Sequence, residues 1–196
     1  MTTTAVLSAP EEARPSRTAV ALIAPALAGG AVAVALGVYG RVHDATFRPV
    51  FDLGFPSMQA MKAWLATGAV TLALFQLLSA LAMYGRLPFV RRVPRWLPFA
   101  HRWSGTAAFL LSLPVAYHCL WALGFESDAG ARPLIHSILG CAFYGAFTTK
   151  LLALRAKRLP GWAIPVIGAT LVTVLTALWL TSALWFFTNV DFPAFR

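Results

Sequence analysis

Five long apolar segments constrain this chain more than any other feature of its sequence. They span about residues 19–40, 61–84, 101–124, 134–154 and 162–188, and short loops join them. A helix rises 1.5 Å per residue, so roughly 20 apolar residues cross the hydrocarbon core of a bilayer. Since 59% of the residues are hydrophobic and only 12% are charged, the chain is too apolar for a water-soluble domain. The sequence predicts an all-α integral membrane bundle of five transmembrane helices.

The apolar segments divide the chain into three parts. Residues 1–18 are rich in Thr, Ala, Pro and Glu without apolar periodicity, which predicts a mobile cytosolic tail. Residues 19–188 form the predicted five-span domain, and residues 189–196 form a short external tail. The first apolar run is longer than the roughly 7 to 15 residues of a signal peptide's apolar region, so we interpret it as an uncleaved span.

The basic residues are distributed unequally between the two sides of the predicted bundle. The formal net charge is +9, and 11 of the 16 Lys and Arg residues fall on the side that carries the N-terminus. By the positive-inside rule, the N-terminus is then cytoplasmic and the C-terminus external, in a multi-pass protein of the cell membrane. This arrangement predicts the lipid bilayer, rather than nucleic acid, as the partner of the basic residues.

Two histidines, His118 and His136, lie inside apolar segments on either side of the same short loop. Counting from the centres of their spans places them roughly 9 and 12 Å outward from the membrane midplane. Two neutral imidazoles at one depth on consecutive antiparallel helices are an arrangement that ligates a haem iron from both faces. The pair therefore predicts one haem b between the third and fourth helices. The alternative is that each ring only makes a polar contact with a neighbouring helix.

The residues around these histidines suit a flat cofactor. On the fourth helix, Gly140 and Phe143 stack with His136 by i+4 and i+7 spacing, so one leaves space and the other forms a wall. Pro114 precedes His118 by one turn, and a kink there would open room between helices. Arg132 lies one turn before His136 and is the predicted partner of the haem propionates through charge-assisted hydrogen bonds.

Three further residues are weaker candidates for ligation. His43 follows the first span on the outer side and becomes a rival ligand if that helix extends about one turn further. His101 is about 25 Å of helix from His118, on the cytoplasmic side. There it pairs with Met83 around a second haem, contacts a quinone or a lipid headgroup, or simply begins a helix.

The remaining polar groups in the spans have structural interpretations. We expect Gln76, deep in the second span, to bond a neighbouring helix. The two cysteines, Cys119 and Cys141, fall near the outer side, where the compartment permits a disulfide without implying one. Free cysteine packs well in apolar interiors, so the sequence favours small buried side chains at both positions.

The segments HRWSGTAAFLLSLPVAYHCLWALGF and HSILGCAFYGAFTTKLLALR resemble the cytochrome b561 type of membrane cytochrome. They also resemble small, poorly characterised actinobacterial membrane proteins with five helices, and the resemblance covers roughly residues 58–188. It implies a four-helix core, haem b held by paired histidines, and electron transfer from a donor such as ascorbate or quinol. The family's two-haem pattern needs four core histidines, whereas this core offers three, with none in the second or fifth span. The implied ligands carry over to His118 and His136, with His101 as a weaker match.

The predicted function is electron transfer by a membrane subunit that works with a quinone or a redox partner protein, rather than stand-alone catalysis. No catalytic residue is assigned, and no HExxH or CxxC spacing indicates another metal. A non-redox transporter is one alternative, although no span carries Asp or Glu in its middle and no inverted repeat is evident. A structural or assembly subunit of a membrane complex is the other. The donor, the acceptor and the oligomeric state stay open.

Overall fold

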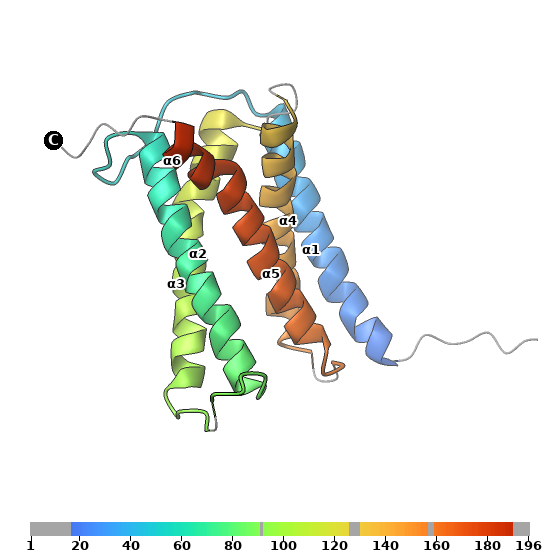
Figure 1. Cartoon of the computed structure of the whole chain (residues 1–196). Helices are drawn as coiled ribbons and strands as arrows, with labels where there is room; N and C mark the ends of the chain where they lie inside the picture. The colour runs from blue at the N-terminus through green and yellow to red at the C-terminus, as the bar shows by residue number, and fades with distance from the viewer. Residues whose placement is uncertain (1–16, 91, 126–129, 157–158, 190–196) are drawn as a thin grey trace, which may run out of the picture.

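The structure is a computed structural model that describes residues 17–90, 92–125, 130–156 and 159–189. Every regular element in these residues is helical, which confirms the all-α prediction. The long helices are α1 (Arg17–Val42), α2 (Met58–Met83), α3 (Leu97–His118), α4 (Ala131–Ala153) and α5 (Ala163–Trp179) (Figure 1). The predicted tails, 1–18 and 189–196, lie almost wholly outside the described residues.

Two of these helices continue beyond their α-helical part. After His118, α3 runs into a π-helical turn, η1 (Cys119–Leu123). After Trp179, α5 runs through a second π-helical turn, η2 (Leu180–Leu184), into the short helix α6 (Trp185–Asn189). Both π turns lie at the same end of the bundle, next to the start of α4 (Figure 1).

Four of the described helical segments are long and apolar enough to cross a membrane. They are Ala21–Val42, Met58–Met83, Leu97–Leu123 and Ala163–Asn189. Many large apolar side chains on their outward faces are exposed, as a lipid-facing surface requires. The chain is therefore a membrane protein. The remaining long helix, α4, is not one of these four, but it lies lengthwise against α1 and α5 (Figure 1).

The helices pack as two groups. In one group α3 lies against α2, and in the other α4 lies between α1 and α5; α2 also contacts α5 (Figure 1). Gln76 of α2 donates to the carbonyl oxygen of His101 and, at 2.8 Å, to Ser104 Oγ, both on α3. The prediction that Gln76 bonds a neighbouring helix is confirmed.

The α1–α4 contact depends on glycine. A Cβ atom on Gly29 of α1 would lie 2.4 Å from the carbonyl oxygen of Gly145 on α4, and one on Gly145 would lie 2.6 Å from the carbonyl oxygen of Gly29. The Thr149 hydroxyl on α4 lies 3.3 Å from the carbonyl oxygen of Pro25 in a hydrogen bond across the same contact. Small residues that let two backbones approach this closely are typical of helix pairs in membranes.

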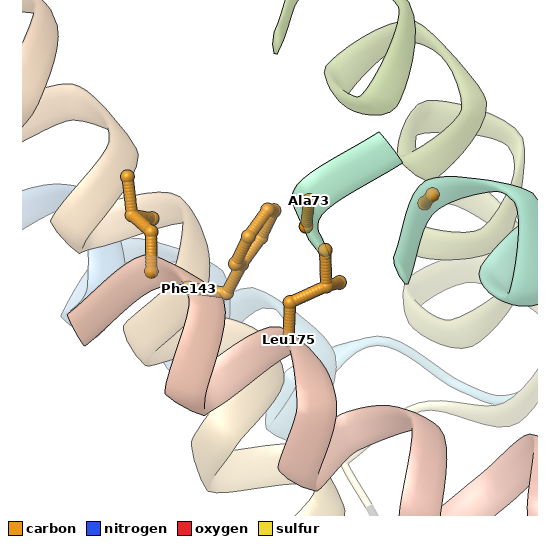
Figure 2. Packing of buried hydrophobic residues seen from close by; sticks show 5 residues of the cluster. Ala73, Phe143 and Leu175 are labelled. Carbon is orange, nitrogen blue, oxygen red and sulfur yellow. The ribbon is translucent and has the colours of Figure 1, made fainter. Parts of the chain in front are cut away.

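Phe143 occupies the centre of the bundle. Its ring, only 6% exposed, extends from α4 toward Ala73 of α2 and Leu175 of α5 (Figure 2). Ala69 and Leu171 complete this cluster of buried residues. The small alanines on α2 leave room for the large ring, so Phe143 connects the two groups of helices.

The segment between α1 and α2 crosses the end of the bundle at which η1 lies (Figure 1). Phe47 N donates to the carbonyl oxygen of Ala122 at 2.9 Å, which attaches the segment to η1. Further along, the Phe51 ring meets the His118 ring edge-on, with centroids 4.5 Å apart. This segment therefore covers the outer end of α3.

Candidate functional site

A cavity of about 410 Å³ lies in the half of the bundle near η1 and η2. Its lining comes from the first half of α2 and of α4, the last turns of α3 and η1, and the end of α5 with η2 and α6. Most of the lining is apolar. The polar and charged groups that matter most for chemistry are Lys62, Cys119, Arg132, His136 and Ser182.

Contacts between side chains of α3 and α4 bound the cavity on the side away from η1. The rings of Phe109 on α3 and Phe147 on α4 stack at 4.2 Å, and the Tyr144 hydroxyl on α4 bonds Ser112 Oγ on α3 at 2.9 Å. Nearer η1 the lining includes Gly140, where an added Cβ atom would meet nothing within 4 Å. The space beside Gly140, which the sequence predicted to be cleared for a cofactor, is open.

His136 is held on the cavity wall in one defined tautomer. Its Nδ1 lies 3.0 Å from Thr181 Oγ1 in η2. The Thr181 hydroxyl has one proton and donates it to the carbonyl oxygen of Ala177 at 2.8 Å, so its oxygen accepts from the His136 Nδ1–H. Nδ1 therefore carries a proton, and Nε2 is the ring nitrogen left for another partner.

Cys119 of η1 lines the cavity together with His136 and Lys62. Since Nδ1 of His136 is bound to Thr181, Nε2 is the ring nitrogen left for another group. A thiol, an imidazole and an amine from three different helical segments therefore line the same cavity.

Arg132 lies at the rim of the same cavity. Its guanidinium donates from Nη1 to the carbonyl oxygen of Thr181 at 2.8 Å and sits 4.1 Å from the centre of the Trp185 ring. Arg132 and His136 thus both bind Thr181, and together they fix the start of α4 to η2. The exposed guanidinium keeps a positive charge at the cavity entrance.

His118 is placed differently from what the sequence predicted. The residues of α3 and η1 that line the cavity are Ser112, Val115, Ala116, Cys119, Leu120 and Leu123, and His118 is not among them. Its ring is fully buried between Phe51 and Tyr117, and its Nδ1 lies 2.8 Å from the carbonyl oxygen of Pro114. Because a carbonyl only accepts, Nδ1 carries the proton, and the buried Nε2 has no partner among the described residues. The structure does not bring the His118 and His136 rings together in the cavity.

The weaker candidate ligands lie away from the cavity. The His43 ring packs between Tyr39 and Trp121, with centroid distances of 5.2 and 4.5 Å. His101 Nδ1 lies 2.7 Å from Ser79 Oγ in the other half of the bundle. Neither histidine lines the cavity, and nor does Met83 at the end of α2. Within the described residues, no three His, Cys, Asp or Glu side chains are grouped to hold a metal ion.

Three features of the cavity wall were not predicted from the sequence: Cys119, Thr181 and the two π turns. Cys119 belongs to η1, and Thr181 and Ser182 belong to η2, so both turns supply the site. π turns with i→i+5 hydrogen bonds are uncommon and often occur at functional sites. Each changes the direction in which the following side chains point. The two cysteines, Cys119 and Cys141, both line the cavity and are free thiols.

The fold and the site define a helical membrane protein with an internal, mainly apolar cavity and a small group of polar side chains in it. The chain belongs to the DUF6529 family, a family of unknown function whose model matches residues 22–194. No curated protein and no solved structure matches the chain. The family description names no activity, so the resemblance to cytochrome b561 stays a prediction.

Proposed function

We propose that this chain is a membrane b-type cytochrome-like electron-transfer protein that binds one haem b in the cavity, with His136 as an axial ligand. The observation that carries the proposal is the position of the His136 ring, which has Nδ1 bound to Thr181 and lies on the wall of a mainly apolar cavity. Histidines that ligate metals share this arrangement, because a hydrogen bond at one nitrogen fixes the tautomer that presents the other.

The cavity has further features that favour haem. Its volume of about 410 Å³ lies in the range of cofactor pockets. Gly140 borders open space one turn from His136, and Phe143 and Trp179 supply aromatic walls. Arg132 at the rim offers a charge-assisted hydrogen bond to a propionate. A bound haem supplies the one-electron chemistry, while these side chains hold it, orient it and exclude water.

A low-spin haem would need a second residue of the cavity to bind its iron. The sequence predicts His118, whose buried Nε2 is free but lies beneath Phe51, outside the cavity. On the side of α3 and η1, the cavity lining contains Cys119, whose sulfur is able to bind iron. For His118 to bind the iron, the end of α3 would have to rotate so that the His118 ring enters the cavity.

The position of the cavity places the proposed haem nearer to one side of the membrane than to the other. The cavity lies near the loop between α1 and α2, which the distribution of Lys and Arg assigns to the external side, with the N-terminus cytoplasmic and the C-terminus external. In this proposal all five long helices span the cell membrane, α4 included. One haem near one side does not complete electron transfer across the bilayer, so a quinone or a redox partner protein supplies the remaining step.

The decisive experiment is a reduced-minus-oxidised visible spectrum of the detergent-purified full chain, expressed with haem supplied, with haem counted per chain. We expect one low-spin b-type haem, lost in His136→Ala. Ile138→Ala is the matched control, because this α4 side chain is 51% exposed on the outer surface and should leave the spectrum unchanged. Loss of the low-spin signal in either His118→Ala or Cys119→Ser identifies the second ligand. Wild-type protein without haem, or a normal spectrum in His136→Ala, overturns the proposal.

A quinone is the second candidate occupant. The observation that favours it is the combination of a mainly apolar lining with Lys62, Arg132 and His136, which suits an amphipathic molecule with polar carbonyl oxygens. Extraction of the purified protein with organic solvent distinguishes the cases, because quinone without haem supports this candidate alone. If neither is found, a non-redox transporter or an assembly subunit becomes the better interpretation.

A further inference from the structure

An open groove of about 440 Å³ lies at the opposite end of the bundle from the cavity, where a loop joins α2 to α3 (Figure 1). Its walls are mainly apolar, and among the described residues Arg92 is the only charged one that borders it. We propose that this groove binds an anionic phospholipid, with an acyl chain along the apolar walls and the phosphate at Arg92 and Arg95. This inference is independent of haem and of the cavity near η1.

The groove forms because α2 ends in a sharp turn. Gly85 follows the helix with a φ of +65°, in the left-handed region. Its N–H donates to the carbonyl oxygen of Ala82 at 3.0 Å, and the N–H of Arg86 donates to that of Leu81 at 2.8 Å. These two bonds make a Schellman motif, which turns the chain away from the helix axis. The loop residue Phe89 then lines the groove together with the last turns of α2.

The inside of the groove suits a hydrocarbon chain. Apart from Arg92, Ser79 is the one lining residue with a polar side chain among the described residues. The Ser79 hydroxyl donates to the carbonyl oxygen of Phe75 at 2.7 Å, and its oxygen lies 2.7 Å from Nδ1 of His101. Both the proton and the oxygen of this hydroxyl are therefore engaged. An acyl chain needs no hydrogen-bond partner, so it can fill the groove without leaving a polar group of its own unpaired.

The loop beside the groove carries positive charge without an acidic partner. Arg92 and Arg95 both belong to this loop and are exposed. The described residues contain only two carboxylate side chains, Asp44 and Asp52, and both lie between α1 and α2 at the other end of the bundle. Within this part of the chain, the two guanidinium groups therefore have no carboxylate to pair with. A phosphate group complements them through charge-assisted hydrogen bonds.

The level of the groove in the membrane indicates a phospholipid as the occupant. The last turn of α2 and the first turn of α3 meet here, and the side chains of Trp96 and Trp103 at the start of α3 are exposed. Tryptophan is enriched at the interface between membrane and water, where acyl chains meet headgroups. Basic pockets at this level are typical binding sites for anionic lipid headgroups.

The test is native mass spectrometry of the detergent-purified full chain, titrated with dioleoylphosphatidylglycerol or with dioleoylphosphatidylcholine. The two lipids have the same acyl chains, but only the first has a net negative charge, and we expect it to bind more tightly. A basic residue near an anionic headgroup contributes about 1 kcal/mol, which is about fivefold in affinity. Arg92→Gln should therefore weaken binding of phosphatidylglycerol about fivefold, and Arg92→Gln combined with Arg95→Gln should weaken it about 25-fold.

Two control variants separate the groove from its surroundings. Arg155→Gln removes a positive charge from an exposed residue at the same end of the bundle, but in the loop after α4, and should leave the affinity unchanged. Phe89→Ala removes an apolar wall at a side chain that is 78% exposed and should weaken binding of both lipids severalfold. Phe99→Ala, at an exposed side chain of α3 outside the groove, should weaken neither.

Three outcomes overturn the proposal, whether or not the protein binds haem. The first is equal affinity for the two lipids, because the charge of the headgroup then has no effect. The second is a loss in Arg155→Gln as large as that in Arg92→Gln, which assigns the effect to the overall charge of this side. The third is displacement of phosphatidylglycerol by an equal concentration of inorganic phosphate, since an acyl chain in the groove then contributes nothing to binding.

Discussion

The close contact of α1 with α4 makes Gly29 one of the least replaceable residues of the bundle. In Gly29→Ala the added Cβ atom would lie 2.4 Å from the carbonyl oxygen of Gly145, about 1 Å nearer than the ordinary contact of 3.4 Å, and nearer still to Thr149 Oγ1. A threonine side chain can rotate away, but a helix backbone cannot. The two helices must therefore separate, at a cost of about 1–3 kcal/mol typical of overpacking.

The neighbouring residue provides the control. Gly30 is on the same helix, and a Cβ atom there would meet nothing within 4 Å. Both substitutions bring the same gain in helix propensity, up to about 1 kcal/mol in water-soluble helices, so the difference between them isolates the clash. We expect Gly29→Ala to unfold about 4–8 °C below Gly30→Ala in detergent, as about 2 kcal/mol predicts for a chain of this size. Equal midpoints would refute the backbone contact.

Three further predictions concern single hydrogen bonds. Thr181→Val removes the acceptor of His136 Nδ1–H and should weaken haem binding about 10–100-fold in a haem titration, whereas Ile138→Ala, outside the cavity, should not. Gln76→Leu removes the side-chain bonds that join α2 to α3 and should lower the free energy of unfolding by about 0.6–2 kcal/mol, measured by denaturation in mixed detergent. Tyr144→Phe removes the hydroxyl that links α4 to α3 and should cost about 1 kcal/mol by the same assay; no change would contradict the bond.

Most of the bundle is predictable because a backbone that crosses lipid must satisfy its hydrogen bonds internally, and a helix does so. An apolar run of the right length must form a helix that satisfies its own hydrogen bonds, so the five helices lie close to the predicted ranges. Gln76 is predictable for a related reason, since an amide at that depth needs a partner and the adjacent helix supplies one. The position of His136 near the start of α4 follows from the same pattern.

Which helices pair could not be derived in the same way. The sequence analysis placed the haem between the third and fourth helices because they are consecutive. In the structure α3 packs on α2, and α4 packs on α1 and α5. The α1–α4 pairing depends on Gly29 and Gly145, which are 116 residues apart and face each other only after folding. A contact between two glycines that are far apart in the chain produces no periodic pattern in the sequence.

The identity of the side chain that lines the cavity at the end of α3 depends on direction around the helix rather than on depth. Successive residues of a helix point about 100° apart, so His118 and Cys119 share a depth but not a face. Nonlocal contacts decide between them, because Phe51 covers the His118 ring and Pro114 holds its Nδ1. The π turn that begins at Cys119 then redirects the chain beyond it. The end of the bundle at which these residues lie was therefore predictable, whereas the residue of this part of the chain that lines the cavity, Cys119 rather than His118, required the packing of the whole bundle.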